Sequence, residues 1–180
     1  MARVFTVGHG ARPIEEFTEI LTAAEIEVLV DVRRFPGSRR HPHFAREALE
    51  ISLPAVGVAY EWWGETLGGR RKPREDSPNI AWRNDSFRAY ADHMASEEFG
   101  GALVKLEKNA EGTAQAVMCA ETLWWRCHRR LIADALVAHR LDVIHLGLGN
   151  DAPHQLNEAA RLTDEGVLVY DVGEAQQLKI

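Results

Sequence analysis

A group of residues near the middle of the chain could together carry out thiol chemistry. Cys119 stands two residues before Glu121, and Cys127 is followed directly by His128 and Arg129. A cysteine thiolate is a nucleophile and a soft metal ligand, histidine and glutamate can transfer protons, and arginine can hold an anion. The seven residues between the two cysteines can form a turn that brings the thiols together, although the spacing does not require it.

The surroundings of Cys127 favour the thiolate form. We expect this residue at the start of a helix and flanked by three arginines, Arg126, Arg129 and Arg130. The helix dipole and the guanidinium charges would both lower the pKa of the thiol, which makes Cys127 a candidate nucleophile or metal ligand. The alternative is structural, with Cys119 a buried strand residue and His128 a surface residue of the helix, because free cysteine is commonly buried.

The elements that must position these residues alternate along the chain. Short runs rich in valine and isoleucine predict strands at 4–7, 28–32, 116–119, 143–146 and 167–170, with a weaker strand at 58–62. Helical periodicity predicts helices at 13–25, 44–53, 86–95, 97–109, 127–139 and 153–162. The alternation predicts one α/β domain over residues 1–180, with a mostly parallel sheet of about five strands and helices on both faces.

Local signals mark several of the helix ends. Pro13 stands at a first helical position, Asp85 and Ser86 are expected to cap the helix at 86–95, and Ser96 is expected to cap the next helix. Residues 64–84 are rich in glycine, proline, arginine and aspartate and predict a long basic loop. A loop of that length in a compact domain is usually functional or mobile.

Polar residues follow almost every predicted strand. In chain order they are Gly8-His9-Gly10, Asp31-Val32-Arg33, Cys119-Ala120-Glu121, His145 with Gly147, and Asp171. In an open parallel sheet the ligand site lies outside the carboxyl ends of the strands. We therefore expect these side chains to meet at one edge of the sheet.

The charge is distributed unevenly along the chain. With 21 Lys+Arg and 27 Asp+Glu, the formal net charge is −6. Residues 31–74 nevertheless contain nine basic and five acidic side chains, a net charge of +4, whereas the segments before and after are acidic. Arginine forks and helix N-termini suit phosphate and carboxylate, so this pattern predicts one specific anionic ligand rather than nonspecific coating of nucleic acid. The five tryptophans either pack internally or offer rings on which a base could stack.

Composition narrows the class of protein. Hydrophobic residues make up 46% of the chain and charged residues 27%, the balance of a soluble globular domain. No apolar run approaches the roughly 18 residues of a membrane span and no signal-peptide pattern is present, so we expect a cytoplasmic protein with no membrane partner. Two cysteines are too few for a disulfide framework, and the lack of a Cys-x-x-Cys motif speaks against a redox pair.

Several short motifs occur together in this chain. They are Thr6-Val7-Gly8-His9, Asp31-Val32-Arg33 with Pro36 and Ser38, Gly68-Gly69, Cys119-Ala120-Glu121 and Cys127-His128-Arg129. In this order they resemble a bacterial family described as domain of unknown function 488, over about residues 3–150; Gly10 departs from the serine usual at that place. The resemblance implies a compact α/β domain with the motifs gathered at one site, and it supplies no reaction. We assign ligand binding to Gly8, Asp31, Arg33, Pro36, Ser38, Gly68, Gly69 and Arg129.

Three functions are compatible with such a site. The first is an enzyme acting on a nucleotide or nucleic-acid-derived anion, with candidate catalytic residues Cys119, Glu121, Cys127, His128 and His9. The second is a metal site formed by some of the cysteines and histidines, with Glu121 as a further ligand or beside it. The third is a binding module without catalysis, in which the cysteines are structural. The expected partner is an anionic small molecule or a nucleic-acid component, and the sequence indicates no particular cofactor.

Overall fold

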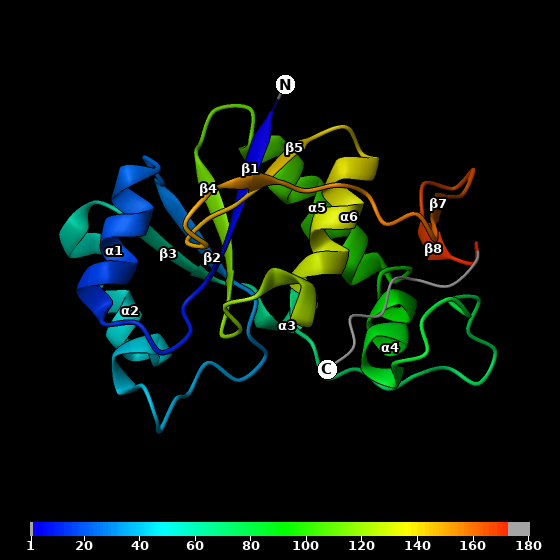
Figure 1. The fold of residues 1–180 in the computed structure, drawn as a ribbon, viewed down its shortest axis with the longest axis horizontal. Coiled ribbons are helices and arrows are strands. Elements are labelled where there is room, and N and C mark those ends of the chain that lie inside the picture. Colours follow the sequence, from blue (N-terminus) through cyan, green and yellow to red (C-terminus); the bar gives the residue numbers. More distant parts are fainter. Residues whose placement is uncertain (1, 173–180) are drawn as a thin grey trace.

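The computed structural model describes residues 2–172, and its centre is a six-stranded sheet in the order β3-β2-β4-β1-β5-β6 (Figure 1). Five strands are parallel: β1 (Arg3–Gly8), β2 (Val28–Asp31), β3 (Ala59–Trp62), β4 (Gln115–Cys119) and β5 (Asp142–His145). The sixth, β6 (Ala152–Pro153), is antiparallel to β5. The predicted α/β class with a mostly parallel sheet is confirmed.

Helices cover both faces of the sheet (Figure 1). One face carries α1 (Ile14–Ala23) and α2 (Arg46–Ser52). The other carries α3 (Gly64–Leu67), α4 (Asp85–His93), α5 (Glu97–Asn109) and α6 (Arg129–Ala138). Three short 3-10 turns lie between these elements, η1 (Pro42–Phe44), η2 (Pro54–Val56) and η3 (Trp124–Arg126).

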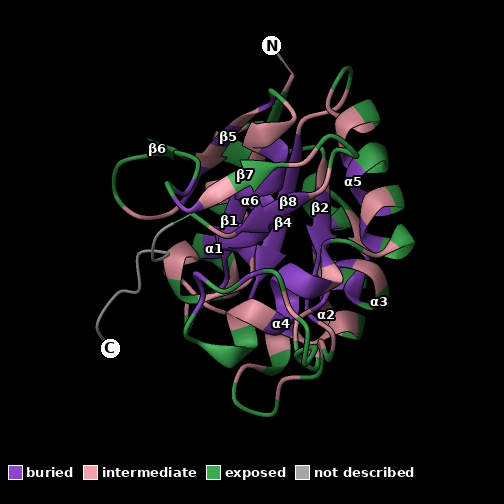
Figure 2. Ribbon diagram, turned by 90° about the vertical axis from the view of Figure 1, so that its right-hand side faces the viewer, coloured by how far each residue is buried: buried purple, intermediate pink, exposed green. Residues whose placement is uncertain are grey.

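The sheet separates two hydrophobic cores because successive side chains of a strand point to opposite faces. Leu29 packs in the core below α1 and α2, and Val30 packs in the core below α4, α5 and α6. Figure 2 shows the resulting pattern, with buried strands at the centre and exposed outer faces on the helices. The same alternation sends Cys119 toward the α6 side, whereas Tyr60 packs on the α1 side.

The helix boundaries follow their local chemistry. Ser96 caps α5 as predicted, because its Oγ accepts the Phe99 N–H. The cap of α4 is Asn84 rather than Asp85 or Ser86: its Oδ1 accepts the N–H groups of Ser86 and Phe87. This correction moves the helix start by one residue, since an amide oxygen serves as an N-cap as well as a hydroxyl or carboxylate. The predicted helix at 44–53 is divided, with η1 ending at Phe44 and α2 starting at Arg46.

The prediction of a helix at 153–162 is wrong. This part of the chain contains β6, an irregular segment and β7 (Ala160–Leu162). The polar side chains of His154 and Asn157 are buried in it, where His154 contacts Asp134 and the Asn157 backbone N–H donates to the same carboxylate. These contacts stabilise an extended path that helical periodicity does not reveal.

The last predicted strand forms, but outside the main sheet. Among the described residues, β8 (Leu168–Tyr170) pairs with β7 alone, in an antiparallel hairpin that turns at Gly166 with φ +78°. A turn of this kind makes local pairing possible, and the hairpin packs beyond α6 (Figure 1). Asp171 therefore lies away from the carboxyl edge of the parallel sheet and pairs with Arg161.

Two further corrections concern the segments around the candidate site. The predicted helix at 127–139 starts at Arg129, so Cys127 precedes it with an extended backbone at φ −138° and ψ 170°. The predicted loop at 64–84 begins with the short helix α3, and only residues 68–84 lack regular structure.

Within residues 2–172, no helix is both long enough and apolar enough to cross a membrane.

Candidate functional site

The fold brings the two cysteines together with His128. The two sulfur atoms and a ring nitrogen of His128 all lie within 4.8 Å of one another. Cys119 is the last residue of the central strand β4, and the loop from 120 to 128 returns over the strand end to place Cys127 beside it. The spacing therefore permits proximity, and the tertiary structure realises it.

The two thiols differ in protonation. Burial by itself would raise the pKa of Cys127, but a hydrogen bond from Cys119 and the charge of Arg129 outweigh it and lower that pKa to about 5. The pKa of Cys119 is raised well above its ordinary value, because its proton is held by the hydrogen bond to Cys127 and because it is buried. At neutral pH the pair is one thiolate on Cys127 and one thiol on Cys119.

Arg129 is the counterion of this thiolate. Its guanidinium is 1% exposed, and its Nε donates to Cys127 Sγ at 3.4 Å. Its Nη2 donates to the carbonyl oxygens of Glu121 and Thr122, and its Nη1 to Thr6 Oγ1 at 3.4 Å. A buried guanidinium needs several hydrogen-bond acceptors. Arg129 therefore holds the 120–128 loop in place and supplies a positive charge beside the Cys127 thiolate.

Gly8 makes this loop path possible. A Cβ added at Gly8 would lie 2.0 Å from the carbonyl oxygen of Glu121 and 2.7 Å from Thr122 Cα. The first residue after β1, His9, donates its N–H to the Cys119 carbonyl. The end of β1 and the cysteine loop are thus packed backbone against backbone.

His128 lies between the cysteines and the basic loop. Its Nε2 donates to the Val32 carbonyl at 3.2 Å, which leaves Nδ1 as the lone-pair nitrogen. A Cβ at Gly69 would lie 3.2 Å from that Nδ1, so glycine lets the loop approach the ring closely. Burial lowers the pKa of His128, and the ring is neutral at neutral pH.

Glu121 makes contacts within the loop that carries Cys127, and its proposed part in proton transfer stays a prediction. Its carboxylate accepts the Leu123 N–H at 3.2 Å, and its backbone carbonyl accepts from Arg129. Both contacts stabilise the turn after β4. Glu121 therefore shapes the loop that carries Cys127.

Three of the other candidates, His9, Asp31 and Arg33, form a second cluster on the α1 and α2 side of the same sheet edge, whereas Gly68 packs against Gly64 and Arg34. Arg33 pairs with Asp31, with Nη2 2.6 Å from Oδ2, and donates through Nη1 to His9 Nε2 at 3.2 Å. Tyr60 donates its hydroxyl to Asp31 Oδ2 at 2.6 Å. His9 stacks on Phe44 with ring centroids 4.3 Å apart.

His9 is a positioning residue in this arrangement. Its Nδ1 donates to the Gly10 carbonyl at 2.8 Å, and its Nε2 accepts from Arg33, so both ring nitrogens are engaged. Burial, together with the charge of Arg33, lowers the pKa of His9 to about 4. In this structure the neutral ring of His9 has both nitrogens hydrogen-bonded and orients Arg33.

A cavity of about 350 Å³ opens above this second cluster. Its polar lining combines charge and hydrogen-bonding groups from the predicted motifs and the basic segment: His9, Arg33, Ser38, Arg40 and His41. Gly10 and Ala120 line it as well, and Ala120 directly follows Cys119. Pro36 is not part of the lining; its carbonyl accepts the Arg46 N–H and closes the turn before α2.

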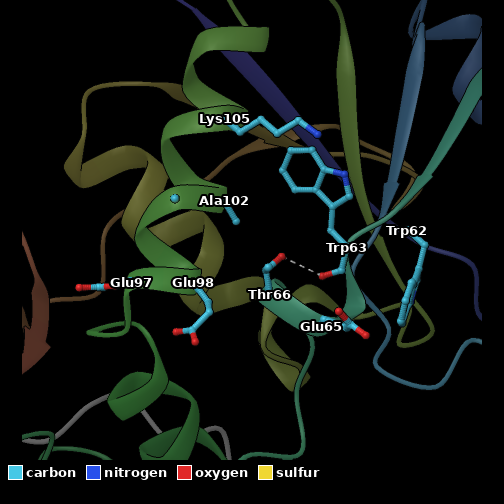
Figure 3. A pocket seen from close by; sticks show the side chains of 9 residues that line it. Trp62, Trp63, Glu65, Thr66, Glu97, Glu98, Ala102 and Lys105 are labelled. Carbon is cyan, nitrogen blue, oxygen red and sulfur yellow. Dashed lines mark hydrogen bonds between the residues drawn. The ribbon is translucent and has the colours of Figure 1, made fainter.

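A larger cavity of about 520 Å³ lies between α3 and α5 (Figure 3). Three acidic residues, Glu65, Glu97 and Glu98, are among those that line it. The ammonium of Lys105 lies 4.2 Å from the ring centre of Trp63. Negative charge opposes an anion there. The basic cavity at the strand ends is therefore the better candidate for the predicted ligand.

The tryptophans mostly pack against the protein itself. Trp82 is 1% exposed and contacts Phe87 and Tyr170, and Trp124 stacks on His145 with ring centroids 4.1 Å apart. The guanidinium of Arg46 lies 4.7 Å from the ring centre of Trp62. These contacts favour the internal-packing interpretation over base stacking.

Sequence reasoning missed a buried chain of hydrogen bonds behind Arg129. Thr6 Oγ1 is 2.7 Å from His145 Nδ1, His145 Nε2 is 2.9 Å from His154 Nδ1, and His154 Nε2 is 2.8 Å from Asp134 Oδ1. Tyr170 donates its hydroxyl to the other carboxylate oxygen at 2.8 Å. These hydrogen bonds link Arg129 to β1, β5, α6 and the β7–β8 hairpin.

The donor and acceptor inventory fixes the direction of every bond in this chain. Both carboxylate oxygens of Asp134 accept, from the Asn157 N–H and the Tyr170 hydroxyl, so His154 donates through Nε2 and accepts at Nδ1 from His145. His145 then accepts at Nδ1 from the Thr6 hydroxyl, whose oxygen remains free to accept from Arg129. Burial, reinforced by the neighbouring His154 and Arg129, lowers the pKa of His145 to about 3, consistent with a neutral ring.

The only sequence signal for this series of buried hydrogen bonds is His145 within a predicted strand. Thr6 and His145 are 139 positions apart, and Asp134 lies on a helix predicted for other reasons. No spacing rule connects them.

The comparisons with known proteins add one match. No curated protein and no solved structure matches the chain. The family model described as Domain of unknown function DUF488 matches residues 13–136, which is more than half of the chain. The chain therefore belongs to the DUF488 family.

Proposed function

We propose that this protein is an enzyme that binds a phosphate-bearing anion, nucleotide or nucleic-acid-derived, and uses Cys127 as its reactive group. The observation that carries the proposal is the half-buried Cys127 sulfur, which lies beside Cys119 and accepts from the Nε of the buried Arg129 at 3.4 Å; these two neighbours lower its pKa to about 5. A structural cysteine in an apolar core would have its pKa raised instead. A thiolate with a fixed counterion is the state required of a nucleophile.

The basic segment supports an anionic substrate at this edge. Arg33 and Arg40 line the 350 Å³ cavity, and Gly69 of the same segment lies against His128. Arg33 is held by Asp31, whereas Arg40 is exposed and, among the described residues, has no ion-pair partner. Arg40 is thus available to a phosphate.

The anion is tested by calorimetric titration of inorganic phosphate, pyrophosphate and nucleoside monophosphates into the wild-type protein. Arg40→Gln should weaken binding about tenfold, the value of one charge-assisted hydrogen bond. Arg39→Gln is the matched control, because Arg39 is the exposed neighbour outside the cavity lining. Equal affinities of both variants and the wild type would place the anion elsewhere.

Catalysis is tested on a panel of phosphorylated compounds. Turnover should vanish in Cys127→Ser and persist at a reduced rate in Cys119→Ser, because only Cys127 carries the thiolate. Anion binding without turnover anywhere in the panel would instead support a binding module. Full turnover in Cys127→Ser would overturn the proposed role of the thiol.

A metal site is the second candidate, favoured by the close approach of Cys119, Cys127 and His128. These residues could supply two sulfurs and one nitrogen, a set that suits zinc. The guanidinium of Arg129, 3.4 Å from Cys127 Sγ, opposes a cation at that place because it already neutralises the thiolate. We therefore expect elemental analysis of the tag-free protein to find no stoichiometric zinc; one zinc per chain would reverse this ranking.

A further inference from the structure

The two sulfurs of the site form an asymmetric pair that can be joined. Both cysteines are free, and their sulfur atoms lie within 4.8 Å of each other. Cys119 is 6% exposed, whereas Cys127 is half-buried and so within reach of a small reagent. A small solute can therefore reach the sulfur of Cys127, and the sulfur of Cys119 lies close to it in the interior.

The backbone allows the remaining approach. Cys119 is fixed on β4, which is hydrogen-bonded to both β1 and β2. Cys127 lies between η3 and α6 with an extended backbone, outside any helix or strand. Disulfide bonds need a sulfur separation of about 2.05 Å, so closing the bond requires a small shift, which we expect at Cys127 because it lies in irregular backbone rather than in a strand or helix.

We propose that Cys119 and Cys127 form a reversible disulfide when a peroxide oxidises Cys127. The bond would consume the thiolate, so its effect on activity rests on the proposed function. The absence of a Cys-x-x-Cys motif does not oppose it, because the fold supplies the proximity that such a motif would otherwise provide.

The chemistry balances in two steps. The Cys127 thiolate attacks one oxygen of hydrogen peroxide, the O–O bond breaks, and the leaving hydroxide takes a proton to become water, which leaves a sulfenic acid on Cys127. The Cys119 sulfur then attacks the Cys127 sulfur, the S–O bond breaks, and hydroxide leaves with the Cys119 proton as a second water. A dithiol reductant returns both thiols and is itself oxidised to a disulfide.

Arg129 tolerates both states of the pair. In the reduced state its Nε donates to the thiolate, and its other nitrogens donate to Thr6 and to two loop carbonyls. Only the first of these contacts depends on the charge of Cys127. The loop therefore keeps its anchor when the thiolate is replaced by a neutral disulfide.

The test treats the full chain with one to a few equivalents of hydrogen peroxide, followed by N-ethylmaleimide, intact mass measurement and peptide mapping. The expected product is a monomer lighter by about 2 Da, closed to N-ethylmaleimide at both cysteines and reopened by dithiothreitol. In Cys119→Ser, dimedone should trap a sulfenic acid on Cys127. In Cys127→Ser, Cys119 should remain a free thiol at the same peroxide dose.

Several results would overturn the proposal. In one, Cys119 of the wild-type protein can still be alkylated after peroxide treatment. In another, oxidation ends at a sulfinic acid on Cys127. In the third, the disulfide joins two protein chains. The wild-type mass and peptide map decide the matter even where a variant fails to fold. Circular dichroism of Cys119→Ala and Cys119→Ser identifies such a variant.

The test also separates the disulfide from the proposed function, because it needs no substrate. An intramolecular disulfide without turnover on any phosphorylated compound would sustain the inference and remove the enzyme. Thiol-dependent turnover that persists after peroxide, with both cysteines still open to alkylation, would support the proposed enzyme and overturn the disulfide.

Discussion

At the residue scale, the lowered pKa of Cys127 depends on a neighbouring thiol and on the charge of one buried arginine. Arg129 lies within hydrogen-bonding distance of the sulfur, and its charge lowers the pKa of the thiol against the effect of burial. α6 starts two residues later, at Arg129. The lowered pKa therefore comes from the neighbouring Cys119 and Arg129 rather than from a position of Cys127 inside the first helical turn.

Replacing Arg129 by glutamine should raise the pKa of Cys127, because one of the groups that lower it is lost. In the wild type the rate of alkylation by iodoacetamide should be constant above about pH 6, because the thiolate is already fully formed. In Arg129→Gln the pH midpoint should rise to about 8, short of the ordinary value because the hydrogen bond from Cys119 remains, and the rate at pH 7 should fall by about tenfold. Stopped reactions analysed by peptide mapping give the rate at Cys127 itself.

Arg126→Gln is the control for this experiment. Arg126 is exposed and adjacent to Cys127, and its replacement by glutamine removes the same charge from the protein. Its alkylation profile should overlay that of the wild type. An equal effect of both variants would mean that the overall field, and not the Arg129 contact, controls the thiol.

At the element scale, the ends of β1 and β4 and the loop leading into α6 depend on one another. Gly8 leaves room for the Glu121 carbonyl, and Arg129 holds that carbonyl from the other side. Thr6, on the same strand as Gly8, accepts from Arg129 and donates to His145 on β5. The site is therefore held by pairs of elements rather than by any single loop.

Gly8→Ala should destabilise the protein by more than about 2 kcal/mol, because the new methyl group would meet backbone atoms that cannot rotate away. Urea denaturation followed by circular dichroism measures this loss. Gly100→Ala within α5 is the matched control, since a Cβ there has no atom within 4 Å. That variant should gain about 0.5–1 kcal/mol from reduced backbone entropy of the unfolded chain.

Thr6→Val should weaken the buried chain at its link to the site. Valine keeps the shape but leaves His145 Nδ1 without its donor and Arg129 Nη1 without an acceptor, at a cost of about 1–3 kcal/mol in the free energy of unfolding. Thr6→Ser retains the hydroxyl and should lose less than half as much. If valine and serine destabilise equally, the hydroxyl contributes packing volume only.

At the scale of the whole molecule, the protein is acidic overall, but its basic segment, residues 31–74, passes the carboxyl edge of the sheet. The segment supplies Arg33 and Arg40 to one side of that edge and Gly69 to the other. Behind the edge, His9 and His145 are buried and neutral. Arg40 is exposed in the cavity of about 350 Å³, whereas Arg33 and the two neutral histidines are buried.

These histidines should make the protein sensitive to acid. Burial lowers the pKa of His9 to about 4 and that of His145 to about 3, whereas both titrate near 6.5 in the unfolded chain. Between these values the unfolded state binds more protons, so the free energy of unfolding decreases as the pH falls from about 6.5 to 4. Each histidine contributes up to about 1.4 kcal/mol per pH unit.

Urea denaturation at a series of pH values measures this slope. His9→Gln and His145→Gln should each be less stable than the wild type at pH 7, yet lose less stability per pH unit between 6 and 4. An unchanged slope in both variants would show that other groups govern the acid response.

The residue pattern predicted much of the fold. Alternation of apolar runs with helical periodicity identified the five parallel strands, and Ser96 correctly marked the start of α5. Periodicity failed at 153–162, where His154 and Asn157 exchange helical bonds for contacts with Asp134. It also could not assign β8 to a separate hairpin, because strand propensity carries no information about the pairing partner.

By itself, the sequence determined which residues end the parallel strands, and with them that Cys119, Asp31 and His9 gather at one edge, because parallel strands present their carboxyl ends together. Only the tertiary structure decided that these residues divide between the two sides of that edge, that the cysteine sulfurs approach within 4.8 Å, and that Thr6, His145, His154 and Asp134 stand behind Arg129. The physical reason is that strand ends are set by local patterns, whereas hydrogen bonds between residues as far apart as Thr6 and His145 exist only once the strands have paired.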